Sequence, residues 1–223
     1  MTRMFAEVAK TWNPVVGCEY LCSYCWALGL ATGRLKNVPY YKDGFKPKLG
    51  RSKLNKTFRQ GLIFLSSMGD LWGPWVPDEW ITEVLVAIRK SPNATFLALT
   101  KNPERYHQFL QVMPQNMILG TTIETNRQTG FLSKAPSCLI RTCHLASLHG
   151  FGKMVSIEPI LEFDVGILTS WIRLIKPDFV YVGYDNHGHK LDEPSLEDTE
   201  TLIKALSEFT EVRRKTIRKA WWE

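Results

Sequence analysis

The chain has 223 residues, of which 44% are hydrophobic and 22% are charged, and its formal net charge at pH 7 is +6. This length allows one sizeable core but is short for two domains, and a balance of +6 favours an anionic partner only weakly. There is no run of about 18 apolar residues and no apolar signal segment at the start, so we expect neither a membrane span nor secretion.

The cysteines indicate the kind of site to expect. There are five, and three of them lie within eight residues, too close together for a sensible disulfide framework. Clustered free thiols are typical of cytosolic proteins that bind a metal or carry out redox chemistry. We therefore expect a cytoplasmic protein with a single domain over residues 1–223.

Short apolar runs alternate with amphipathic stretches along the chain. Six runs have the length and composition of buried parallel strands; they are Lys10–Val16, Leu62–Ser67, Thr95–Thr100, Met117–Glu124, Met154–Glu158 and Phe179–Gly183. Beyond a short first helix, helices are predicted at Asp78–Lys90, Glu104–Met113, Thr125–Leu132, Ile140–His149, Gly166–Ile175 and Ser195–Phe209. About six βα units with right-handed crossovers predict an α/β fold, a partial (open) parallel TIM-type barrel, because a full barrel needs about 250 residues.

One segment, from Arg34 to Arg59, differs in composition from the rest of the chain. It contains nine Lys and Arg residues and one acid, Asp43, so its charge is +8. Tyr40, Tyr41 and two phenylalanines lie between the basic residues. We interpret residues 34–59 as a basic insertion between the first helix and the second strand. Such a segment can follow a phosphate backbone and stack on bases, or it is simply a solvated basic loop.

The three clustered cysteines, Cys18, Cys22 and Cys25, have the spacing Cys-x3-Cys-x2-Cys at the end of the first predicted strand. Cysteine thiolates hold iron–sulfur clusters, and a cubane has four irons. Three thiolates leave one iron open, and an open position lets a metal site bind a substrate. The spacing therefore predicts a 4Fe-4S cluster whose open iron binds the amino and carboxylate groups of S-adenosylmethionine (SAM).

Other interpretations of these cysteines remain open. A structural zinc needs a fourth ligand, for which Cys138, Cys143 and His144 are the candidates, but Cys138 and Cys143 lie about 140° apart on a helix. Both are interpreted as buried structural cysteines, since free cysteine packs as a small apolar residue. A simple electron carrier is disfavoured by the lack of a fourth nearby cysteine, because carriers normally saturate their irons.

The cysteine spacing, with the aromatic Tyr24 directly before the third cysteine, resembles the signature of the radical SAM superfamily. Further segments resemble one uncharacterised branch of it, found in phages and microbes. They are Thr11–Pro14, Ser67–Leu71, Leu99–Glu104, Gly120–Glu124 and Ser156–Pro159. The resemblance implies the cofactors, a 4Fe-4S cluster and S-adenosyl-L-methionine, and leaves the substrate open. It also implies that the turn containing Ser67, Gly69 and Asp70 meets the SAM amino group.

Polar residues follow the apolar runs at the strand ends, where the functional face of such barrels lies. Thr122 and Glu124 share one face of their strand, as do Ser156 and Glu158, and inward carboxylates need a partner or a purpose. We expect these four residues to contact SAM. Lys101 is expected to pair with the SAM carboxylate.

Each of these residues also has a structural interpretation. In that interpretation Lys101 is a solvated surface lysine, Thr100 caps a helix, and Glu124 or Glu158 pairs with an arginine for structural reasons. Asp185 and His187, after the sixth strand, are candidates for holding substrate or relaying a proton, or they belong to a polar loop without a catalytic role.

These observations predict a radical SAM enzyme that cleaves SAM reductively and starts radical chemistry on an unidentified substrate. The cluster would take its electron from an external donor such as a flavodoxin or ferredoxin. Nucleic acid is one substrate class that fits the basic segment. The alternative function is a non-catalytic basic module, held together by zinc or an iron–sulfur cluster, that binds nucleic acid.

Overall fold

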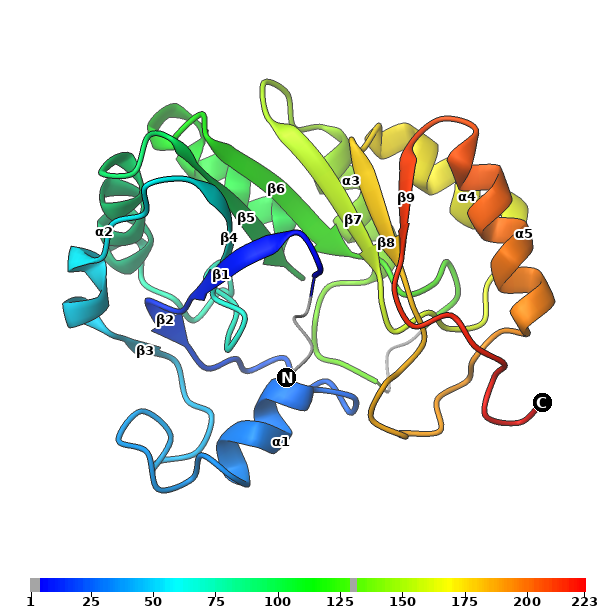
Figure 1. Ribbon diagram of the computed structural model, residues 1–223, viewed down its shortest axis with the longest axis horizontal. Coiled ribbons are helices and arrows are strands. Elements are labelled where there is room, and N and C mark those ends of the chain that lie inside the picture. The colour runs from blue at the N-terminus through cyan, green and yellow to red at the C-terminus, as the bar shows by residue number, and fades with distance from the viewer. Residues whose placement is uncertain (1–4, 129–131) are drawn as a thin grey trace.

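A computed structural model of the protein describes residues 5–128 and 132–223. Seven strands form one parallel sheet in the order β1-β4-β5-β6-β7-β8-β9, which curves into an open half-barrel (Figure 1). The strands are β1 Val8–Trp12, β4 Gly61–Leu65, β5 Ala94–Thr100, β6 Met117–Thr122, β7 Gly152–Ile157, β8 Phe179–Val182 and β9 Glu211–Arg214. A second, two-stranded antiparallel sheet pairs β2 (Val15–Val16) with β3 (Lys48–Leu49).

Helices follow most strands, as right-handed crossovers require. They are α1 Trp26–Thr32, η1 Arg51–Asn55, α2 Asp78–Arg89, η2 Pro103–Val112, α3 Cys138–Ala146, α4 Val165–Ile175 and α5 Leu196–Ser207. Helices α2 to α5 cover the convex side of the sheet (Figure 1). The loops after β6, β7 and β8 gather with α1 at the lower edge in this view, which is the carboxyl edge of the strands.

The alternation of side chains along the strands divides the core in two. On the convex side, residues such as Ile63, Phe96 and Val155 pack against the helices in the main core. On the concave side, Phe64 and Met154 pack with other apolar side chains in a smaller cluster. The polar residues that continue the concave face, at the strand ends, are therefore directed into the half-barrel, as the strand pattern predicts.

The prediction of a partial parallel barrel is confirmed. The sheet also contains a seventh strand, β9, which the sequence did not reveal. This edge strand reads Glu-Val-Arg-Arg and none of its residues is fully buried, so it lacks the apolar run by which the other strands are recognised. Its register places Val212 beside Val180 of β8.

Two other predicted elements differ from the structure. The first predicted strand, Lys10–Val16, is broken at Asn13–Pro14, because proline has no N–H for the sheet and the chain turns to pair with β3. The helix predicted over Thr125–Leu132 is wrong in the part that the structure describes. Residues 125–128 and 132 are not helical, and residues 129–131 lie outside the described residues. The segment predicted as a helix over Glu104–Met113 is 3₁₀-helical.

Within the described ranges, 5–128 and 132–223, none of the helices has the length and apolar character needed to cross a membrane.

Candidate functional site

The three clustered cysteines lie on the loop between β2 and α1. Backbone hydrogen bonds tie this loop to two distant segments: Gly17 N–H donates to the Met68 carbonyl at 2.8 Å and Cys18 N–H to the Phe45 carbonyl at 3.1 Å. Asp70 N–H donates back to the Gly17 carbonyl at 3.3 Å. The cysteine loop is therefore fixed against the turn that follows β4, at the carboxyl edge of the sheet.

All three cysteines have free thiols. Cys25 is the N-cap of α1, and its Sγ accepts a hydrogen bond from Leu28 N–H at 3.3 Å. Cys22 Sγ lies 3.1 Å from Ser133 Oγ. Burial, and after it the negative charge of Asp70, raises the pKa of the Cys18 thiol.

The three cysteines of this loop are the residues that would hold a metal cluster. Among residues 5–128 and 132–223, no three His, Cys, Asp or Glu side chains are close enough to hold one metal ion. Cys18, Cys22 and Cys25 all have free thiols and follow one another on this loop. A cubane distributes three thiolate ligands over three irons, and a bound cation deprotonates such thiols outright. Three free thiols on one loop thus fit a cluster with one open iron.

Two glycines allow the cysteine loop to approach its neighbours closely. Gly17 has φ +88°, and a Cβ on it would lie 2.3 Å from the Lys46 carbonyl oxygen. A Cβ on Gly69 would lie 2.6 Å from the Gly17 carbonyl oxygen. Both contacts are with backbone, which cannot rotate away, so only glycine fits at either position.

The variant Gly17→Ala is expected to lower the free energy of unfolding by more than about 1 kcal/mol, because it adds both left-handed strain and a backbone clash. Chemical denaturation measures this. Gly44→Ala is the matched control, since Gly44 has φ +83° but nothing within 4 Å of an added Cβ. Equal destabilisation of the two variants would show that the close contact contributes nothing.

Asp70 joins the ends of β4 and β5. Its buried carboxylate accepts hydrogen bonds from Thr100 Oγ at 2.7 Å, from Trp72 N–H at 3.0 Å and from Lys101 N–H at 3.0 Å. Burial raises the pKa of Asp70 despite these bonds. In the same turn, Ser67 Oγ donates to Asn13 Oδ1 at 3.2 Å. The side chains of Ser67 and Asp70 thus stabilise this turn. Its backbone faces the cysteine loop, where Met68 and Asp70 are hydrogen-bonded to Gly17.

Glu124 is the centre of a buried charged cluster. Arg141 Nη2 lies 2.9 Å from one carboxylate oxygen, and Lys101 Nζ pairs with the other, to which Tyr24 OH donates at 2.5 Å. Lys101 Nζ also lies 3.1 Å from Tyr24 OH. Burial alone would raise the pKa of Glu124, but Arg141 and then Lys101 hold that pKa well below its ordinary value.

This cluster joins the cysteine loop to β5, β6 and α3, and it contains two cations for one carboxylate. Tyr24 belongs to the cysteine loop, so Tyr24, Lys101 and Glu124, all predicted site residues, are brought together. Glu124 and Lys101 are each other's partner here, so a SAM carboxylate would share Lys101 with Glu124. The alternative interpretation of Glu124, as a carboxylate that pairs with an arginine, agrees with its contact with Arg141.

The other predicted residues lie further along the same edge. Thr122 and Ser156 are buried, and Glu158 pairs with Lys215 from the segment after β9. Burial raises the pKa of Glu158 although Lys215 opposes this.

Asp185, after β8, accepts from the His189 backbone N–H at 2.8 Å and lies 2.9 Å from His189 Nδ1. Burial alone would raise the pKa of Asp185, but these His189 bonds hold it below its ordinary value. His187 is exposed, and its ring centroid lies 5.9 Å from that of His189. Asp185 is thus already paired with His189, while His187 faces solvent.

Sequence reasoning missed part of this site. Cys138 is buried as predicted, but its Sγ lies 3.3 Å from Glu124 Oε2 and 3.1 Å from Arg141 Nη2, so it belongs to the charged cluster. Cys143 is exposed, and its interpretation as a buried cysteine is wrong because it lies on the outer face of α3. Arg141 was missed, because its burial beside Glu124 follows from the packing of α3 and from no local pattern in the sequence.

A cavity of about 450 Å³ opens beside this cluster. Tyr24, Glu124 and Cys138 are among its lining residues, and Trp171 of α4 contributes an aromatic surface. The charged cluster is thus accessible from a space large enough for a small molecule.

The parallel half-barrel resembles that of radical SAM enzymes in solved structures. With spore photoproduct lyase complexed with dinucleoside spore photoproduct, the TM-score is 0.57 and the identity 9%, covering 91% of this chain and 62% of that one. A mutant of the lyase with bound AdoMet and dinucleoside spore photoproduct gives a TM-score of 0.57 and 11% identity, covering 87% and 60%. The chain therefore spans about three fifths of these lyases, and at this identity the likeness is one of fold.

The fold is therefore a parallel half-barrel of the kind seen in these lyases. The chain belongs to the family described as protein of unknown function (DUF5131), whose model matches residues 5–192. The match covers the cysteine loop, the basic segment and all strands except β9. No curated protein matches the chain.

Proposed function

We propose that this protein is a radical SAM enzyme in which Cys18, Cys22 and Cys25 hold a 4Fe-4S cluster. The observation that carries the proposal is the position of three free thiols on one loop, fixed by Gly17 and Asp70 at the carboxyl edge of a parallel half-barrel. When bound, the reduced cluster supplies the electron that cleaves the sulfonium of SAM to give a carbon radical.

The residues around the cysteine loop have distinct roles in this proposal. The backbone of the Ser67–Asp70 turn meets the SAM amino group, and Lys101 meets its carboxylate while also pairing with Glu124. Thr122, Glu124, Ser156 and Glu158 contact the ribose and methionine parts of SAM. Tyr24, on the cysteine loop, donates a hydrogen bond to Glu124 and so forms the boundary of the SAM site on the side of that loop. Asp185 and His187 contact the substrate or move a proton.

The substrate is proposed to be a nucleic acid. The lyases of similar fold bind a dinucleoside photoproduct, and in this chain the Arg34–Arg59 segment carries a charge of +8. The electron is proposed to come from an external flavodoxin or ferredoxin.

Metal analysis after anaerobic reconstitution with iron and sulfide tests the cofactor. We expect about four irons and about four sulfides per chain. One zinc per chain, retained after exposure to excess iron and sulfide, would instead support a non-catalytic module and contradict the proposal.

A further inference from the structure

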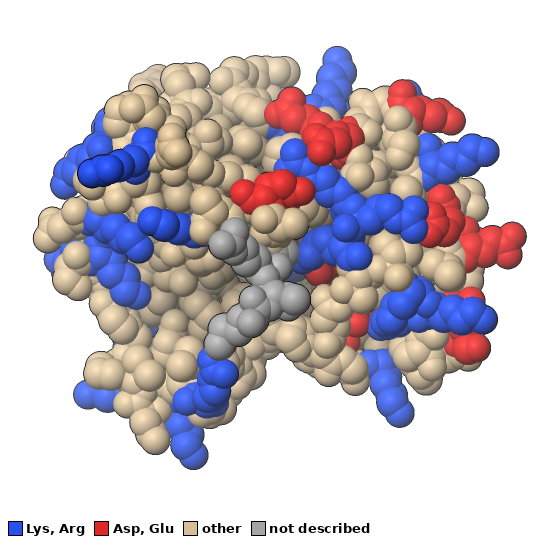
Figure 2. Space-filling model, viewed as in Figure 1, with Lys and Arg blue, Asp and Glu red and all other residues tan. Residues whose placement is uncertain are grey.

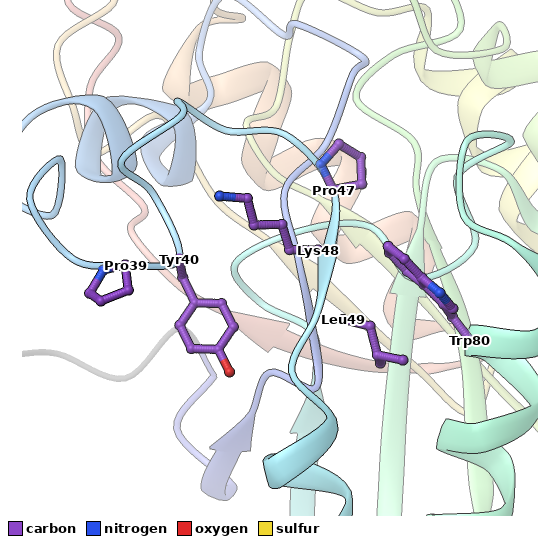
Figure 3. Close-up of a pocket in the computed structure, with 6 residues that line it drawn as sticks. All are labelled: Pro39, Tyr40, Pro47, Lys48, Leu49 and Trp80. Atoms are coloured by element: carbon purple, nitrogen blue, oxygen red, sulfur yellow. The ribbon is translucent and has the colours of Figure 1, made fainter.

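A groove of about 380 Å³ lies on the basic segment, beside the first turn of α2. It is lined by Pro39, Tyr40, Pro47, Lys48, Leu49 and Trp80. Figure 3 shows Tyr40 and Trp80 on opposite sides of Lys48 and Leu49. Two aromatic rings therefore flank a strip that contains one ammonium group.

Both rings are held in place by the surrounding structure. Lys53 Nζ lies 4.1 Å from the centroid of the Tyr40 ring, and a Cβ on Gly50 would come within 2.6 Å of the Tyr40 hydroxyl. Trp80 is half-buried and packs against the main core. Rings that are already fixed lose little conformational entropy when a ligand stacks on them.

The groove is surrounded by positive charge. Lys48 pairs with Asp43 at 2.9 Å and Arg51 with Glu83 at 3.2 Å. The other exposed basic residues of the segment have no ion pair within residues 5–128 and 132–223; they are Arg34, Lys36, Lys42, Lys46, Lys56 and Arg59. The left side of Figure 2, where β3 and η1 lie, shows blue side chains and almost no red. An exposed pair such as Lys48–Asp43 is weak, so a phosphate can replace the carboxylate.

The groove is also next to the cysteine loop. Pro47, one of its walls, lies against Gly17, because a Cβ on Gly17 would be 2.7 Å from Pro47 N. Leu49, another wall, pairs with Val15 of β2, two residues before Gly17. A chain bound in the groove is thereby held beside the loop that carries Cys18.

We propose that this groove binds single-stranded nucleic acid, with unpaired bases against Tyr40 and Trp80 and a phosphate on Lys48. Its meaning as a substrate site rests on the proposed function, but binding itself needs no cluster. Unpaired bases are required because a base within a duplex has no free face to stack on a protein ring. The remaining basic side chains follow the backbone on either side.

Fluorescence anisotropy of a labelled oligothymidylate, titrated with the full chain over a series of salt concentrations, tests the groove. We expect Trp80→Ala to weaken binding about tenfold or more and Trp80→Phe to retain most of it, because phenylalanine still offers a stacking face. Tyr40→Leu is expected to weaken binding independently, so a fold defect in one variant leaves the other as a test. Far-UV circular dichroism checks that each variant is folded.

Charge is tested with a matched pair of exposed lysines. Lys46→Gln is expected to reduce the slope of log affinity against log salt by about 0.7, the value for one phosphate contact on a single strand. Lys204→Gln removes the same charge from α5 and should change nothing. Folded Trp80→Ala and Tyr40→Leu with wild-type affinity, equal effects of both lysine changes, or equally tight binding of duplex DNA would each overturn the proposal. Binding without SAM cleavage would instead contradict the proposed function alone.

Discussion

Replacing Cys22 by alanine is expected to abolish cluster assembly. With one of three thiolates missing, an iron of the cubane loses its only protein ligand, and metal-binding free energies for thiolate sites are large enough that this loss is not compensated elsewhere. Iron and sulfide analysis after reconstitution, together with the visible absorption of the cluster, measures the effect. We expect iron in the variant to fall to background.

Cys143→Ala is the matched control for Cys22→Ala. It removes a cysteine that is exposed on α3 and lies outside the motif, so iron content should equal that of the wild type. Cys22→Ser adds a second comparison, because it keeps the side-chain volume near Ser133 while replacing the thiol. If Cys22→Ala kept its full iron content, or if Cys143→Ala lost it, the assignment of the ligands would be wrong.

Replacing Glu124 by glutamine is expected to lower the free energy of unfolding by about 3–5 kcal/mol. The change leaves the Arg141 guanidinium, 3% exposed, without its carboxylate, and removing one partner of a buried pair costs this much because the other charge stays buried. Lys101 loses its partner as well. Urea denaturation of the full chain measures the loss.

Glu162→Gln is the control for Glu124→Gln, because Glu162 pairs at 3.2 Å with the half-exposed Arg127, and such pairs contribute about 0–1 kcal/mol. Adding Arg141→Met to Glu124→Gln should restore part of the stability, since the buried charge is then absent. Equal losses for Glu124→Gln and Glu162→Gln would contradict a buried cluster centred on Glu124.

The same residue predicts a dependence on pH. The pKa of Glu124 is lower in the folded protein than its ordinary value, because Arg141 and Lys101 outweigh the effect of burial. The stability that it contributes is therefore fully present above the ordinary carboxyl pKa of about 4.3 and is lost as pH falls through the lower folded-state pKa. The difference in unfolding free energy between wild type and Glu124→Gln should shrink in that acid range.

The sequence predicted the fold well where strands are buried on both faces. Leu62–Ser67, Thr95–Thr100 and Phe179–Gly183 lie within one or two residues of β4, β5 and β8, because continuous apolar runs are the signal of parallel strands. The edge strand β9 carries no such signal. Its place is set by pairing with β8 and not by its own composition.

In the candidate site, too, the sequence predicts only those residues that a local pattern identifies. The cysteine spacing is local in the chain, so it could be read directly, and the strand-end position of Glu124 followed from alternation. Its partner Arg141 lies 17 positions away on α3, and nothing in a local pattern pairs the two. Lys215, which pairs with Glu158, was out of reach for the same reason, since that contact needs the position of the unpredicted β9.

Cys138 shows that a correct prediction of burial does not identify the contacts that a side chain makes. Free cysteine is usually a small apolar core residue, and Cys138 is indeed buried. Its contacts with Glu124 and Arg141 arise because α3 packs against β6 with this residue in its first turn. The helix register places Cys143 on the opposite, exposed face.

Production of 5′-deoxyadenosine from SAM tests the central claim most directly. The reconstituted full chain is incubated anaerobically with a strong reductant and SAM, and the nucleoside and methionine are quantified by liquid chromatography and mass spectrometry. The account predicts that both accumulate in equal amounts and only when the reductant is present. A protein with a full complement of iron and sulfide that forms neither product would contradict it.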